Sequence, residues 1–124
     1  MRDKILKASK ELFYKYGVKR MTMDDIAKHL AVSKKTLYQF FDDKEQIVNA
    51  QSELTISEHK KSFEKIHHEA IDPIDEFFSV SKHMGLILSE INPIFFYDLQ
   101  KFYPEVWKKF LDFKMECACG MLEN

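Results

Sequence analysis

Residues 21–48 read MTMDDIAKHLAVSKKTLYQFFDDKEQIV, and this stretch contains the start signals of two short helices. Thr22 precedes an amphipathic segment at 23–30 that has two aspartates in its first turn. Ser33 precedes a second segment, which we expect to continue to about Phe41. Threonine and serine are favoured N-caps, and acidic residues stabilise the positive end of a helix. Two short helices separated by a three-residue turn are typical of a helix-turn-helix motif.

The segments on either side are also predicted to be helical. An apolar stripe with the period of an α-helix predicts a helix at 2–16, and Gly17 is suited to end it. Asp43 can cap a longer helix that begins at Lys44. The apolar residues expected on the inner face of this longer helix are Ile47, Val48 and Leu54.

Proline divides the rest of the chain. Proline follows a capping residue at two places and opens a helix at a third, which predicts helices at 73 to about 91, 93 to 101 and 104 to about 120. With three glycines and three prolines in 124 residues, the sequence predicts an all-α fold. We interpret most of the aromatic and methionine residues of this part as core, namely Phe77, Phe78, Met84, Phe95, Phe96, Tyr97, Phe102, Tyr103, Trp107, Phe110 and Phe113.

Charge is distributed unevenly along the chain. Residues 1–50 carry eleven Lys and Arg against seven Asp and Glu, a balance of +4. Residues 51–124 carry eight against thirteen, a balance of −5, so the net charge of the whole chain is −1. A basic N-terminal part, 1–50, followed by an acidic C-terminal part, 51–124, suggests that only the N-terminal part, which we call the front, binds a polyanion.

Several classes of protein find no support in the sequence. Neither a signal peptide nor an apolar run long enough to span a membrane is present, so we expect a reduced, cytoplasmic protein. No Ser/His/Asp set, glycine-rich phosphate loop or carboxylate pair supports an enzyme. The residues that invite a metal hypothesis are His59, His67, His68, His83, Cys117 and Cys119. A Cys-x-Cys without a second ligand pair is a poor zinc module, so we expect solvated histidines, packed thiols, and no metal or cofactor.

The N-terminus of the second short helix has the chemistry of a DNA-binding surface. Lys34 and Lys35 lie at the positive end of a helix, where a phosphate or a guanine edge is a natural partner. Thr36 can contact a thymine methyl group or donate a hydrogen bond. The other side chains that can reach phosphate oxygens are those of Thr22, Tyr38 and Lys44. A solvated basic turn, with Tyr38 in the core, is the alternative.

These residues, taken together, closely resemble the DNA-binding signature of TetR/AcrR-type transcriptional regulators. The resemblance covers about residues 2–54, including ILKASKELFYKYG at 5–17 as the first helix. The matching residues, which are specific as a set rather than one by one, include Thr22, Ile26-Ala27, Val32-Ser33, Thr36-Leu37-Tyr38, Phe41 and Lys44-Glu45. It implies a homodimeric repressor with a DNA-binding domain at 1–46 and a helical effector-binding and dimerisation domain at 47–124.

The resemblance also implies roles for individual residues. Lys34, Lys35 and Thr36 fall at base-facing positions of the recognition helix. The complete set of implied DNA-binding residues is Thr22, Ser33, Lys34, Lys35, Thr36, Tyr38, Gln39, Phe40 and Lys44.

The sequence departs from the family pattern at three positions. Ala31 replaces a common glycine of the turn, and it strains the turn if a positive φ is required. Lys35 replaces a small residue. Phe40 replaces a frequent histidine or tyrosine, and we expect it to pack rather than donate a hydrogen bond.

The rear half resembles the effector-binding part of the family. NPIFFYDLQKFYPEVW at 92–107 is similar to the junction of the sixth and seventh helices, which commonly lines or gates the effector site. The implied pocket residues are Phe78, Met84, Phe96, Phe102 and Trp107. Family members usually continue for further helices, so we expect either a fragment or a different mode of dimerisation, with an exposed apolar face at the C-terminus.

The sequence thus predicts a regulator that binds double-stranded DNA at a near-palindromic operator and is released by a small, largely apolar effector. Two other classes remain open. One is a helical protein-interaction module that never contacts DNA, and the other is a small-molecule carrier with a vestigial front.

Overall fold

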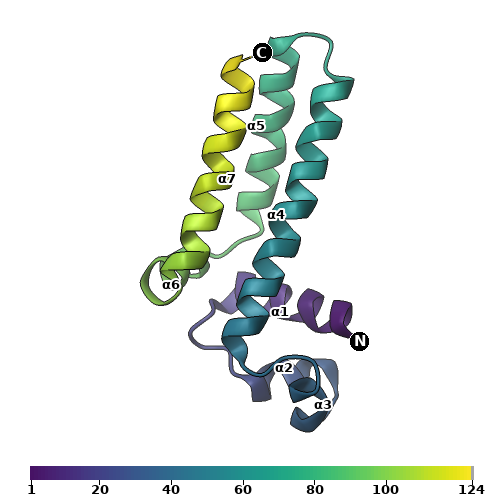
Figure 1. The fold of residues 1–124 in the computed structure, drawn as a ribbon, viewed down its shortest axis with the longest axis vertical. Coiled ribbons are helices and arrows are strands. Elements are labelled where there is room, and N and C mark those ends of the chain that lie inside the picture. Colours follow the sequence, from purple (N-terminus) through teal and green to yellow (C-terminus); the bar gives the residue numbers. More distant parts are fainter. Residues whose placement is uncertain (124) are drawn as a thin grey trace.

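The computed structural model describes residues 1–123, with side chains as far as Lys114, and these residues form seven α-helices (Figure 1). The helices are α1 (Arg2–Tyr16), α2 (Met23–Leu30), α3 (Lys34–Tyr38), α4 (Lys44–Glu69), α5 (Pro73–Ser89), α6 (Pro93–Phe102) and α7 (Pro104–Glu123). The all-α prediction is confirmed, and so are the bounds predicted for the first two helices and the start of α4.

A small head is formed by α1, α2, α3 and the first turns of α4. Its core takes apolar side chains from each of these helices, and the fully buried ones include Ile5, Phe13, Ile26, Leu37 and Ile47. Burying a side chain of this size stabilises a fold by about 1.5–3 kcal/mol. The head is therefore held together by residues spread over its helices rather than by any one of them.

Two helix ends differ from the prediction by three residues, and the ends of α5 and α6 differ by one or two. α3 ends at Tyr38 instead of about Phe41, because the Phe40 N–H donates to Leu37 O (3.1 Å) and tightens the last turn. α7 continues past Gly120, where the sequence suggested a stop, to Glu123. A glycine within a helix lowers its stability without ending it.

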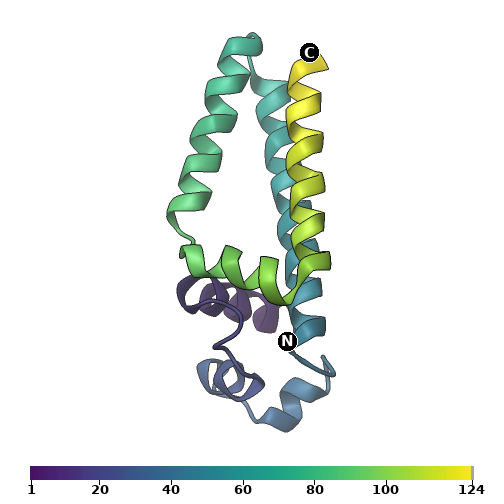
Figure 2. The same cartoon turned by 90° about the vertical axis from the view of Figure 1, so that its left-hand side faces the viewer.

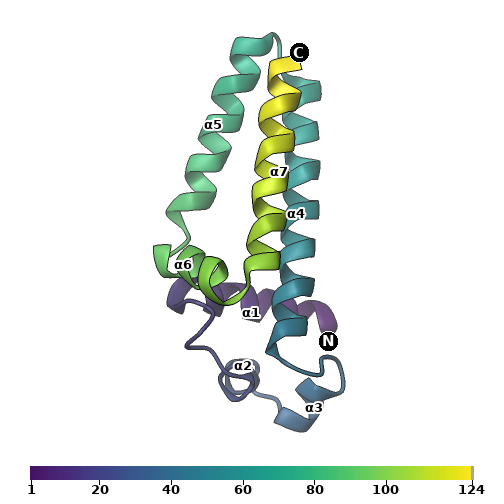
Figure 3. The same ribbon diagram turned by 60° about the vertical axis from the view of Figure 1, so that its left-hand side comes forward.

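The long helix α4 connects the head to a rear lobe, which consists of the rest of α4 together with α5, α6 and α7. It has 26 residues, which corresponds to a length of about 39 Å. It runs alongside α5 and α7, as Figures 1 and 3 show. Leu54 was predicted on its inner face but is 42% exposed. Gln51 and Thr55 occupy that face instead and hydrogen bond each other (2.6 Å).

The short helix α6 lies at the base of the lobe, next to α1 and across the long helices (Figures 2 and 3). Phe95 is buried and meets the Tyr14 ring edge-on, with 4.9 Å between the ring centroids. The Asn92 N–H donates to Tyr14 O (2.8 Å), which satisfies a carbonyl at the end of α1. α6 is thus the part of the lobe that rests directly on the head.

The aromatic set of the lobe is only partly core. Phe95 and Phe113 are buried, and Met84, Phe96, Tyr103, Trp107 and Phe110 are half-buried. The core interpretation is wrong for the exposed residues Phe77, Phe78, Tyr97 and Phe102. Two of these lie on α5, which packs mainly against α4 and leaves much of its apolar face uncovered.

Some expectations concern the C-terminal end of the chain. The packed thiols of Cys117 and Cys119, and the apolar C-terminal face, lie outside the described side chains. Within residues 1–123 no helix is both long enough and apolar enough to cross a membrane.

The turn between α2 and α3 contains the expected backbone strain. Ala31 has φ 59° and ψ 40°, the left-handed conformation, and is the C-cap of α2. This conformation costs an alanine about 1–2 kcal/mol of steric strain. A glycine avoids the strain but loses more backbone entropy on folding, which costs about 0.4–1 kcal/mol. We therefore expect Ala31→Gly to raise the free energy of unfolding by about 0.5–1 kcal/mol. Urea unfolding followed by circular dichroism measures this change, and an unchanged or lower midpoint contradicts it.

Candidate nucleic-acid interface

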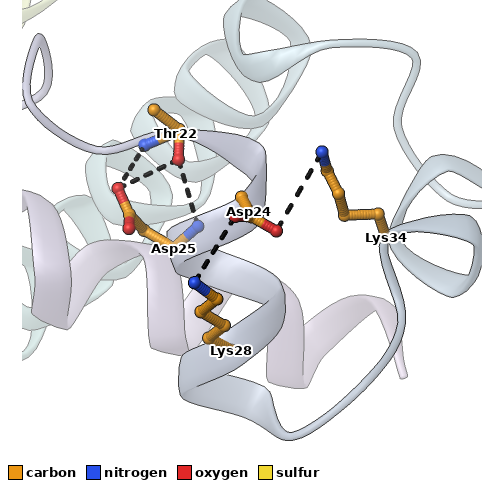
Figure 4. A network of polar contacts seen from close by, with 5 residues as sticks. All are labelled: Thr22, Asp24, Asp25, Lys28 and Lys34. Carbon is orange, nitrogen blue, oxygen red and sulfur yellow. Dashed lines mark hydrogen bonds and ion pairs between the residues drawn. The ribbon is translucent and has the colours of Figure 1, made fainter.

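The helix-turn-helix begins with a complete capping box (Figure 4). The Asp25 N–H donates to Thr22 Oγ1 (3.1 Å), and the Thr22 N–H donates to Asp25 Oδ2 (3.0 Å). The hydrogen bonds from Thr22 also hold the pKa of the Asp25 carboxyl below its usual value. This reciprocal pair fixes the point at which α2 starts.

The recognition helix α3 is oriented by one buried side chain. Leu37 is 0% exposed, whereas Lys34 and Lys35 on the same helix are exposed. Ser33 caps the helix through the Thr36 N–H (3.1 Å), and its hydroxyl also hydrogen bonds the half-buried Thr36 hydroxyl (2.9 Å). The basic N-terminus of α3 therefore points into solvent, while Leu37 holds the opposite side of the helix in the core of the head.

Asp24 links the starts of the two helices. Its carboxylate lies 3.6 Å from Lys28 Nζ and 4.0 Å from Lys34 Nζ, as Figure 4 shows. All three side chains are well exposed, so each ion pair is worth about 0–1 kcal/mol. Sequence reasoning missed this contact, because the distance between the helices depends on the turn. Lys34 must leave Asp24 to contact DNA, at a small cost.

Lys44 has protein partners in the structure. Its Nζ donates to Val18 O (3.0 Å) and Lys19 O (3.5 Å) in the loop between α1 and α2. Burial lowers the pKa of the Lys44 ammonium, and the charge of Asp98 partly opposes this shift. An ammonium has three donors, so one N–H remains for a phosphate oxygen.

The remaining predicted DNA contacts lie at the outer surface of the head. Tyr38 is 47% exposed, which rules out the alternative in which it is part of the core. Phe40 is 42% exposed, so the expectation that it packs is wrong. It follows Tyr38 and Gln39 on the tightened turn that ends α3, and this turn directs it outward.

The residues proposed for an effector pocket do not form one cluster. Phe96 and Trp107 lie together, with 6.1 Å between their ring centroids. Phe102 instead lies under the Lys19 ammonium (4.8 Å), beside the head. Phe78 is 65% exposed on α5, and Met84 is half-buried further along the same helix.

Two of the four histidines of the lobe are less solvated than predicted, whereas His67 and His68 are exposed as expected. His59 and His83 are half-buried, with ring centroids 6.1 Å apart, because both side chains lie between α4 and α5. Burial lowers the pKa of His59. His67 pairs with Glu76 across the α4–α5 hairpin (2.8 Å). Among the described residues, no three His, Cys, Asp or Glu side chains are grouped as metal ligands.

The fold and this surface define a class of protein. An all-α chain carries a compact helix-turn-helix head, and the capped N-terminus of its second short helix presents two lysines outward, next to a half-buried threonine. Helix-turn-helix proteins place this end of the recognition helix in the major groove of DNA.

Comparison with known proteins relates the helix-turn-helix head to one family. Residues 5–50 match the family model of bacterial regulatory proteins of the tetR family. The structure is similar to the crystal structure of Thermus thermophilus FadR, a TetR family transcriptional repressor, in complex with lauroyl-CoA (TM-score 0.59, 19% identity). The similarity covers 99% of this chain and 66% of FadR, just under two thirds of that protein. Among curated proteins, no sequence matches. Residues 5–50 of the chain therefore match the N-terminal domain of tetR family regulatory proteins, and the chain shares its fold with FadR.

Proposed function

We propose that this protein is a cytoplasmic TetR-type repressor that binds a near-palindromic operator as a homodimer and is released by a small, largely apolar effector. The observation that carries the proposal is the geometry of α3: Leu37 is fully buried while Lys34 and Lys35 are exposed at a capped helix N-terminus. Two such helices about 34–36 Å apart occupy successive major grooves of a duplex.

In this proposal the chain divides into a DNA-binding part at 1–46 and an effector-binding and dimerisation part at 47–124. The boundary falls within α4, so one continuous helix belongs to both parts. An effector that tilts or shifts α4 changes the separation of the two recognition helices, and this couples the two binding events.

An apolar effector is supported by the composition of the lobe. The half-buried Phe96 and Trp107 rings meet between α6 and α7, and Met84 is half-buried on α5. Ligand pockets are lined mainly by such side chains. FadR, whose fold is similar, is a repressor whose structure contains lauroyl-CoA. We extend to this chain only the apolar character of the lauroyl group of that ligand.

Selection from a random duplex library tests the proposal. The repressor should recover an inverted repeat with two half-sites, whereas a protein-interaction module should recover none. A small-molecule carrier whose N-terminal part is vestigial should behave differently. An apolar ligand should raise its unfolding temperature by the same amount whether or not a duplex is present. Recovery of no enriched repeat overturns the proposal.

Base recognition is assigned to Lys34 and Thr36. We expect Thr36→Ala or Lys34→Ala to reduce discrimination between the selected operator and single-base variants by about 1–3 kcal/mol per base pair. Affinity for unrelated duplexes should change far less with Thr36→Ala, because its contact is to a base edge. Fluorescence anisotropy with a panel of single-base variants measures both quantities. Equal losses on all duplexes would contradict the role of Thr36.

Phosphate binding is assigned to Lys44. We expect Lys44→Ala to weaken binding to single half-sites of every sequence alike and to reduce the slope of log K against log salt concentration, measured on such half-sites, by about 0.9, the value for one phosphate contact on B-DNA. The control is Lys82→Ala, an exposed lysine on α5, which should leave the slope unchanged. If both variants have the slope of the unmodified protein, Lys44 does not contact phosphate.

A further inference from the structure

A buried carboxylate connects α6 to the loop that leads into α2. Asp98 is 3% exposed, and its Oδ2 accepts hydrogen bonds from the Val18 N–H (2.9 Å) and the Lys19 N–H (3.0 Å). A buried charge of this kind is costly unless it is paired and hydrogen bonded. Three groups meet this requirement: the two amides and the nearby Lys44 ammonium, which interacts electrostatically with Asp98.

The same two loop residues are also held through their carbonyl groups. Lys44, at the start of α4, donates to Val18 O and Lys19 O, so α6 and α4 bind the 18–19 segment through opposite types of backbone group. We call Asp98, Lys44 and these backbone groups the 18–19 clamp. Gly17 permits the close approach, because a Cβ there would lie 2.6 Å from Asp98 Oδ2.

The clamp leads directly to the DNA-binding helices. Val18 O also accepts a hydrogen bond from the Met21 N–H (3.2 Å), and Thr22, the next residue, is the N-cap of α2. α2 packs against α3, which carries Lys34 and Thr36. A displacement of the 18–19 segment therefore displaces the start of α2 and, with it, the recognition helix.

On the other side, the clamp is joined to the lobe through α6. Only Tyr103 separates the end of α6 from the start of α7, and Phe96 of α6 contacts Trp107 of α7. The N-terminal end of α6 is tied to α1, since Asn92 donates to Tyr14 O (2.8 Å) and Lys15 O (3.3 Å). α6 thus lies between the lobe and the head, with polar contacts to the head along its length.

We propose that Asp98 is a positioning residue for DNA binding: through the 18–19 clamp it fixes the orientation of the head on α6, so that movements of α6 reach α2 and α3 by a route separate from the tilt of α4. This inference rests on the proposed function, because head orientation matters for affinity only when two heads bind one operator. It makes the spacing of the two half-sites the property that Asp98 controls.

The test compares Asp98→Asn with Asp112→Asn, the same chemical change at an exposed position on α7. Anisotropy measures affinity for the selected operator, for operators with the spacer changed by one or two base pairs, and for a single half-site. We expect Asp98→Asn to lose about tenfold in affinity at the preferred spacing, a typical size for a coupling between sites. Its spacing preference should become nearly flat, while its half-site affinity and all properties of Asp112→Asn should match those of the unmodified protein.

Two results overturn the inference. One is an unchanged spacing preference in Asp98→Asn. The other is a half-site affinity that falls as much as the full-site affinity, because this indicates damage to the head rather than loss of its orientation.

Amide hydrogen exchange in the unmodified protein gives an independent check if Asp98→Asn does not fold. The Val18 and Lys19 amides should exchange as slowly as core amides of α1, and exchange at the rate of an exposed loop overturns the clamp. If the unmodified protein selects no inverted repeat, the proposed function fails, while the exchange rates still decide whether the clamp exists.

Discussion

Leu37→Ala is expected to lower the free energy of unfolding by about 2–5 kcal/mol, the range for a buried leucine truncated to alanine. Leu37 is 0% exposed and is the one buried side chain of the five-residue helix α3. Without it, α3 keeps its Ser33 cap but loses its anchor in the core. We therefore expect operator binding to disappear together with the stability, because Leu37 is the contact that holds the helix carrying Lys34 and Thr36 in the core.

Urea unfolding followed by circular dichroism measures the stability change, and anisotropy measures binding. The matched control is Leu54→Ala on α4, where the leucine is 42% exposed. Its cost should be below about 1 kcal/mol, because little buried volume is lost. Similar losses in the two variants would mean that α3 is not anchored as the structure shows.

Gly17→Ala is expected to lower the free energy of unfolding by about 2–6 kcal/mol, for two reasons that add. Gly17 has φ 87° and ψ 171°, a region populated almost only by glycine, and a side chain there costs about 1–3 kcal/mol. The new Cβ would also lie 2.6 Å from Asp98 Oδ2 and 3.1 Å from Ile94 Cγ2. Moving Asp98 away leaves the Val18 N–H buried without its acceptor, at about 1–3 kcal/mol.

The control for this variant is a glycine that has room for a side chain and an ordinary helical backbone. Gly85 lies within α5, and a Cβ built there meets nothing within 4 Å. Gly85→Ala should therefore raise the free energy of unfolding by about 0.5–1 kcal/mol, since alanine is the better helix former. Unfolding curves of the two variants should shift in opposite directions. A loss in Gly17→Ala no larger than in an exposed-loop substitution would show that the loop is not tightly held.

The head illustrates how much of the molecule short-range sequence patterns predict. Thr22, Ser33 and Asp43 each cap a helix as expected, and Leu37 and Phe41 are buried as expected. An N-cap hydrogen bond joins residues three apart, and the apolar side of a helix follows from its own periodicity. Both signals are complete within a few residues of sequence, so the bounds of α1 and α2 and the outward direction of Lys34 could be predicted.

The sequence alone determined that the chain is all-α and that its recognition helix has a capped, basic N-terminus and a buried apolar side. The tertiary structure decided the contacts between distant residues. Asp98 reaches Val18 across 80 positions, and Lys44 reaches the same residue across 26. It also decided that Phe77 and Phe78 are exposed, although both belong to an apolar pattern typical of a packed helix. Periodicity tells which side of a helix is apolar, but the packing of the other helices determines whether that side is covered and which buried charge meets which backbone group.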